Sequence, residues 1–206
     1  MKKLTAFCIF LFCCGFSFSA DQRIHSIFGI KLGVPYDGEI GEYPNRELLE
    51  YCEKTGRYPP DVLCISRKFK PTRKFLEFGE YSFQLSPKSK ICYSVSAQAV
   101  CKDALSSCKL VSESITLISG KYGIEFGHSK PLMCNSIHMG DIWKCYINDG
   151  DGNLMQTVSI SILKEEWSVR IDITDFEALD VKEREIKSAI RLKPEAYWIK
   201  TKLDAL

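Results

Sequence analysis

The sequence has 206 residues, 45% of them apolar and 26% charged, with 28 Lys and Arg against 26 Asp and Glu. This composition excludes the disordered, collagen-like and multi-span membrane classes, and it provides enough apolar side chains to fill a core. The length predicts one domain, because domains usually span about 100 to 200 residues.

Residues 1–20 have the parts of a secretory signal peptide: a basic start, an apolar run over 4–16 and small side chains near the exit. The run is shorter than the roughly 20 residues of a permanent membrane-spanning helix, which favours cleavage over an uncleaved anchor. Without Lys2 and Lys3, 26 basic residues balance 26 acidic ones. We therefore expect an exported domain over 21–206, periplasmic or secreted from a bacterium, with no membrane span after cleavage and no nucleic-acid partner.

The first half of this domain predicts short elements separated by loops. Residues 24–32 indicate a short strand or turn, and a capped helix follows over about 45–54. Residues 57–73 hold three prolines and predict a long connection. Strand patterns cover 74–85 and 91–100, and the second alternates apolar with polar residues, as in a sheet with one wet face.

The second half predicts a helix over about 108–119 and a hairpin of two strands, 154–163 and 167–174, joined by a polar turn. A helix with one apolar stripe then covers about 175–192. The elements together predict an α+β fold, a two-layer sandwich of a mainly antiparallel sheet with helices packed on one face.

Seven cysteines follow the signal peptide. In an oxidising compartment such a set usually forms disulfides, and an odd number leaves at least one thiol outside them. Spacing does not fix the connectivity, but it favours Cys134 with Cys145, Cys101 with Cys108, and Cys52 with Cys64. Cys92 is then the free thiol, and no basic neighbour is present to make it reactive.

A second interpretation treats His128, Cys134, His138 and Cys145 as the centre of a metal-dependent or thiol enzyme, since all four residue types bind zinc. Their spacing matches no established zinc pattern. Residues 148–153 begin like a calcium loop but lack its later Gly and Glu, which favours an ordinary turn. We expect no catalytic residues, no metal and no cofactor.

Two groups of polar residues are candidates for a binding surface. The first is a basic stretch made of Arg67, Lys68, Lys70, Arg73 and Lys74. The second is the polar side of the predicted hairpin, made of Thr157, Ser159, Ser161, Arg170 and Asp172. Solvated faces explain both groups, and so does a docking surface whose charges select a partner.

Three short motifs carry a resemblance to a known group of proteins: the opening FGIKLG over 28–33, the helix end KYG over 121–123, and the strand VRIDI over 169–173 running into a charged helix. Together they resemble exported bacterial α+β proteins built from helix-on-sheet units of the beta-lactamase-inhibitor-like kind. The resemblance implies binding through the sheet face rather than catalysis, and it transfers no active-site residue.

These observations favour a non-enzymatic protein-binding module, of which an inhibitor or an immunity protein would be one form. Its expected partner is another exported protein, and its expected state is a monomer or weak dimer. The enzyme centred on His128, Cys134, His138 and Cys145 is one alternative. An envelope structural or assembly factor is the other.

Overall fold

The computed structural model describes residues 23–38, 65–127, 137–163 and 166–192. The predicted signal peptide and the helix predicted over 45–54 lie outside these residues. Neither helix in the described part of the chain is long and apolar enough to cross a membrane. The strands are β1 Ser26–Ile27, β2 Ile30–Lys31, β3 Ile65–Phe69, β4 Glu80–Leu85, β5 Cys92–Val100, β6 Ile142–Asn148, β7 Leu154–Ile162 and β8 Ser168–Asp175, and the helices are α2 Ala104–Tyr122 and α3 Phe176–Leu192.

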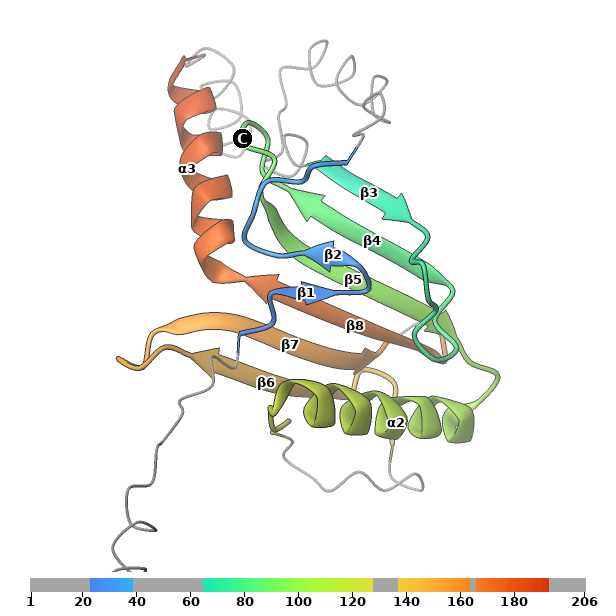
Figure 1. Ribbon diagram of the computed structural model, residues 1–206. Coiled ribbons are helices and arrows are strands. Elements are labelled where there is room, and N and C mark those ends of the chain that lie inside the picture. Colours follow the sequence, from blue (N-terminus) through green and yellow to red (C-terminus); the bar gives the residue numbers. More distant parts are fainter. Residues whose placement is uncertain (1–22, 39–64, 128–136, 164–165, 193–206) are drawn as a thin grey trace, which may run out of the picture.

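Six strands form one antiparallel sheet in the order β3-β4-β5-β8-β7-β6. Helix α2 packs on β7 and β8, and α3 packs on β5, β7 and β8. Figure 1 shows both helices and the small β1–β2 hairpin on the same face of the sheet. The predicted α+β architecture, with helices on one face of an antiparallel sheet, is confirmed.

The core lies between this face and the helices, because alternate residues of each strand point toward it. Val95, Ile173, Val158 and Cys145 stand directly opposite one another across four strands, and each is at most 5% exposed. Full burial of such side chains stabilises the fold by about 1.5 to 3 kcal/mol each. The hairpin predicted over 154–163 and 167–174 is therefore a central part of the sheet, as β7 and β8.

The connection predicted over 57–73 is wrong in part, because β3 lies within it and pairs with β4 along its whole length. The strand predicted from residue 74 begins only at Glu80. Residues 74–79 are instead irregular, with a turn at Leu76 and Glu77 in which Leu76 has a positive φ of 48°. β3 is a charged edge strand, and charge on an edge strand discourages pairing with other chains.

Helix α2 begins earlier and ends later than the predicted 108–119. Asp103 caps its start by accepting a hydrogen bond from the backbone N–H of Ser106 at 2.8 Å, and the Ser106 hydroxyl accepts one from the backbone N–H of Asp103 at 3.1 Å. The end is Gly123, whose φ of 67° suits a left-handed cap and whose N–H donates to the Ser119 carbonyl at 2.8 Å. Gly120, which directly follows the predicted end at residue 119, lies inside the helix.

Two of the three predicted disulfides are wrong, namely Cys101 with Cys108 and Cys134 with Cys145. Cys101 and Cys145 are free thiols, so neither Cys101–Cys108 nor Cys134–Cys145 forms. Cys101 continues the line of β5, with its N–H donating to the Trp167 carbonyl at 2.6 Å, and Cys145 points into the core from β6. Cys108 is disulfide-bonded, and therefore not to either of these two thiols. Cys92 is a free thiol, as predicted, and the pair of Cys52 with Cys64 lies outside the described residues.

Candidate binding surface

The sheet has a second face, here called the open face, on which no described helix packs. Its side chains alternate with those of the core along every strand and are exposed or half-buried. The open face is made of Ser66, Lys68, Glu80, Ser82, Gln84, Ser94, Ser96, Gln98, Ile142, Lys144, Tyr146, Thr157, Ser159, Ser161, Arg170, Asp172 and Thr174.

Strand register brings these side chains into rows that cross the whole sheet. The central row runs through Lys68, Ser82, Ser96, Asp172, Ser159 and Lys144, each directly opposite the next. The hydroxyl oxygens of Ser82 and Ser96 lie 2.7 Å apart and share a hydrogen bond. Residues directly opposite one another in an antiparallel sheet have adjacent side chains, so the row is one continuous polar strip.

Charges on the open face are partly paired. The Lys68 ammonium lies 3.3 Å from the Glu80 carboxylate, and the Arg170 guanidinium donates to Asp172 at 2.9 Å. Burial raises the pKa of Asp172, while the charge and hydrogen bond of Arg170 act against that rise. Within the described part of the chain Lys144 has no ion-pair partner, so the β6 end of the face is positive.

Strand β6 adds apolar groups to the open face. Ile142 is 46% exposed and Tyr146 is 58% exposed, on either side of Lys144. Neither Ile142 nor Tyr146 is among the surface residues predicted from the sequence. The sequence does contain a pattern that could have placed them. Trp143, Cys145 and Ile147 are buried in the core, and Ile142 and Tyr146 alternate with them along β6, so they lie on the opposite face.

The structure brings together only some of the predicted surface residues. Thr157, Ser159, Ser161, Arg170, Asp172 and Lys68 share the open face. The basic stretch does not form a single surface, because Arg67 stands opposite core-facing Phe83 and therefore points to the other face. Lys70 is exposed just past β3, whereas Arg73 and Lys74 line a cavity on the helix-bearing side.

The residues of the alternative enzyme centre lie in different environments. His138 is exposed in the turn before β6, where its backbone N–H donates to the Asp141 carboxylate at 2.7 Å. Cys145 is buried in the core, and burial raises the pKa of its thiol. His128 and Cys134 lie outside the described residues, and within those residues no group of three or more His, Cys, Asp or Glu is arranged to hold a metal.

The turn over 148–153 uses its carboxylate internally. Asp149 accepts hydrogen bonds from the N–H groups of Asp151 and Asn153 at 2.9 and 2.8 Å, and from the Asn153 amide at 2.9 Å. Hydrogen bonds from Asn153 lower the pKa of Asp149. The structure therefore forms the turn that the sequence favours at this place.

Comparison of the chain with protein-family models, with curated proteins and with solved structures found no match to any of them.

Proposed function

We propose that this protein is an exported, non-enzymatic binding module that uses the open face to contact another folded protein. The observation that carries the proposal is the set of polar rows crossing all six strands on a face that no described helix covers. The export part of the proposal rests on the signal-like residues 1–20. The intact mass of the purified chain would test it, because cleavage near residue 20 is expected to leave a chain beginning near Asp21.

The dimensions of the open face suit a specific protein interface. Six strands of 5 to 9 residues, spaced about 4.8 Å apart with about 3.3 Å per residue, give a face of roughly 24 Å by 17 to 30 Å. That area approaches the roughly 800 Å² that each partner contributes to a standard interface.

Its chemistry also suits such an interface. Serine and threonine hydroxyls both donate and accept hydrogen bonds, so they adapt to a partner's polar groups. Tyr146 and Ile142 offer exposed apolar contact area, and tyrosine is enriched among the residues that dominate binding energy. The unpaired charge of Lys144 favours a partner surface with an acidic group opposite β6.

The neighbouring sheet edge is a less suitable docking place than the face. At the outer edge of β6, both backbone groups of Lys144 already form hydrogen bonds with Gly127. The Lys144 N–H donates to the Gly127 carbonyl at 3.2 Å, and the Lys144 carbonyl accepts from the Gly127 N–H at 2.8 Å. A partner strand adding to β6 would have to displace this contact. The face itself requires no such rearrangement.

The experiment compares two variants that each remove an exposed apolar side chain. Tyr146→Ala changes the open face, and Leu105→Ala changes a residue of α2 that is 68% exposed. Immobilised wild-type protein is used to capture partners from an envelope extract, and the dissociation constant of each recovered protein is then measured with purified components.

We expect Tyr146→Ala to weaken binding about tenfold or more, as for a hot-spot residue, and Leu105→Ala to leave it unchanged. Equal affinity of the two variants for every recovered protein would contradict the proposal.

A further inference from the structure

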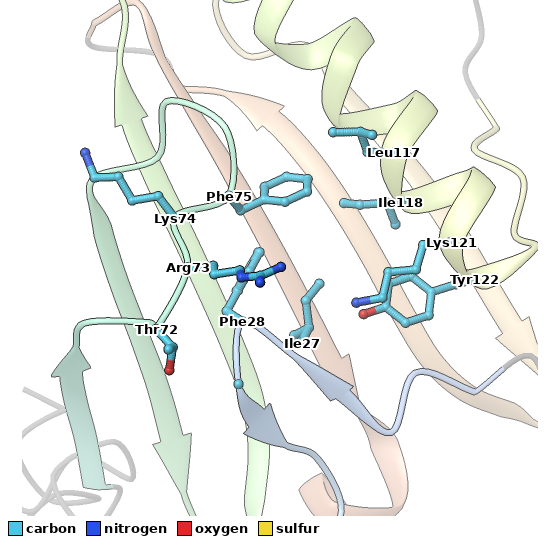
Figure 2. A pocket seen from close by; sticks show the side chains of 11 residues that line it. Ile27, Phe28, Thr72, Arg73, Lys74, Phe75, Leu117, Ile118, Lys121 and Tyr122 are labelled. Carbon is cyan, nitrogen blue, oxygen red and sulfur yellow. The ribbon is translucent and has the colours of Figure 1, made fainter.

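A cavity of about 600 Å³ lies on the helix-bearing side of the sheet. It is bounded by the β1–β2 turn, the connection between β3 and β4, and the last turns of α2, as Figure 2 shows. Its apolar walls are formed by Ile27, Phe28, Phe75, Leu117, Ile118 and Tyr122.

Two cationic side chains reach into this space from opposite sides. Figure 2 shows Arg73 extending from the connection and Lys121 extending from α2, so that their charged ends point toward one another. The Lys121 ammonium also lies 4.9 Å from the centre of the Tyr122 ring. No carboxylate of a described residue forms an ion pair with either cation. Like charges that face one space repel, and an anion between them would replace that repulsion with two attractions.

The wall opposite α2 is fixed by aromatic packing. Phe28 has a φ of 53°, a left-handed conformation that an aromatic residue seldom adopts. Its ring is held against Phe75 and Tyr81, with ring centres 5.4 and 5.3 Å away. Such a conformation persists only where the surroundings enforce it, so the wall is formed before any ligand arrives.

We propose that this cavity binds a small amphipathic anion. Its single anionic group would lie between Arg73 and Lys121, and its apolar body would lie against Phe28, Phe75 and Ile118. A volume of about 600 Å³ is within the range of small-molecule sites, and mostly apolar walls with a few convergent polar groups are typical of them. The site is separate from the open face and extends the protein's binding to a second ligand class.

The test uses two fluorescent probes that share one ring system. 8-Anilinonaphthalene-1-sulfonate carries an anionic group, and N-phenyl-1-naphthylamine lacks it. Both are titrated into the full folded chain and into Arg73→Gln, Lys121→Gln and the double variant. Lys109→Gln, an exposed lysine elsewhere on α2, is the matched control, and circular dichroism checks that each variant is folded.

We expect one sulfonate probe per chain, with its affinity lowered about three- to fivefold by each cavity variant and about tenfold or more by the double variant, as is usual for exposed charge contacts. Lys109→Gln and Tyr146→Ala should leave it unchanged, so failure of the proposed protein-binding function would not affect this result. Added salt should lower the affinity for the sulfonate probe and leave the affinity for the neutral probe unchanged. Dodecanoate should displace the sulfonate probe better than dodecanol.

Equal affinity for the charged and neutral probes would overturn the proposal. An equal loss of affinity for the sulfonate probe in Lys109→Gln and in the cavity variants would also overturn it. So would a result in which neither probe binds.

Discussion

The guanidinium of Arg23 donates to the carboxylate of Asp175 at 2.7 Å, although 152 positions separate the two residues. The same carboxylate accepts from the Gln156 amide at 3.0 Å and caps α3 by accepting from the Ala178 N–H at 3.0 Å. Gln156 in turn exchanges two hydrogen bonds with the backbone of Ile24, at 2.8 and 3.1 Å. One buried carboxylate thus joins the chain before β1, the centre of the sheet and the start of α3.

Replacing Asp175 by Ala should be strongly destabilising. The change leaves the Gln156 amide and the Ala178 N–H without their buried acceptor, while Arg23 keeps its ion pair with Glu177 at 2.7 Å. A buried donor left unsatisfied costs about 1 to 3 kcal/mol, so the expected loss is about 3 kcal/mol. Urea denaturation measures the loss, and Asp180→Ala on the exposed side of α3 should change the free energy of unfolding by less than about 0.5 kcal/mol. A loss below about 1 kcal/mol for Asp175→Ala would show that this network is not a main support of the fold.

The glycine inside α2 and the glycine that caps its end should respond to alanine with opposite signs. Gly120 lies inside the helix, and a Cβ there meets nothing within 4 Å, so Gly120→Ala should raise the free energy of unfolding by about 0.5 to 1 kcal/mol. Gly123 has a φ of 67°, where an added Cβ is strained, so Gly123→Ala should lower it by about 1 kcal/mol. Thermal denaturation of both variants checks the prediction, which fails if the two shifts have the same sign.

Glu185 fastens α3 to the turn between β4 and β5. Its carboxylate accepts from the N–H groups of Lys88 at 2.7 Å and Ser89 at 3.0 Å. Burial by itself would raise the pKa of Glu185, but the hydrogen bonds from Ser89 and Lys88 outweigh it and hold the pKa below its ordinary value of 4.5. Because the folded pKa is the lower one, this contribution is present above pH 4.5 and disappears as the pH falls through the folded pKa.

Glu185→Gln should therefore lower the free energy of unfolding by about 1 kcal/mol at neutral pH, and the difference from wild type should shrink toward zero in acid. Urea titrations across the acid range measure it. Glu183→Gln, on the same helix and in an exposed ion pair with Lys187 at 3.7 Å, is the control and should show little pH-dependent difference. A Glu185→Gln difference that stays constant with pH would contradict the assignment.

The free thiols should react in the order of their exposure. Cys92 is 0% exposed, and burial raises the pKa of its thiol to about 12, so almost no reactive thiolate is present at pH 8. Cys145 is 5% exposed, whereas Cys101 is half-buried at the surface. Brief treatment of the native protein with iodoacetamide should modify Cys101 first, and the other two thiols should react only after unfolding in urea.

Mass spectrometry of the peptides provides the readout, and Cys101→Ser should abolish the rapid reaction. Native Cys92 reacting as fast as Cys101, or Cys101 found in a disulfide, would contradict the described cysteine arrangement.

The parts of the fold predicted from the sequence are those whose signals are local. Apolar and polar residues alternate over 168–174 of β8, over 93–99 of β5 and over 157–162 of β7, and only residues 163–167 separate β7 from β8 in the sequence. β3 was missed because Ser66, Arg67 and Lys68 make up most of it, and Arg67 interrupts the apolar alternation between Ile65 and Phe69. Its pairing with β4 is evident only in the aligned sheet. The end of α2 was misplaced because the sequence does not distinguish a glycine inside a helix, such as Gly120, from one that ends it, such as Gly123. Only the backbone angle φ separates the two.

The candidate surface was predicted in part for the same reason. Ser159 and Asp172 could be placed on one face because their hairpin was evident. Ser82 and Ser96 join them only through strand register, which links residues far apart in the sequence. The basic stretch is continuous in the sequence, yet its successive residues Arg67 and Lys68 lie on opposite faces of a strand.

The most direct test of the open face is photo-cross-linking in cells. A benzophenone amino acid is placed at Ser159, in the central row of the open face, or at Thr116, an exposed position on α2. If the open face binds a partner, position 159 should give a covalent adduct with a second, different polypeptide and position 116 should give none. No adduct from position 159, or the same adduct from both positions, would contradict binding through the open face.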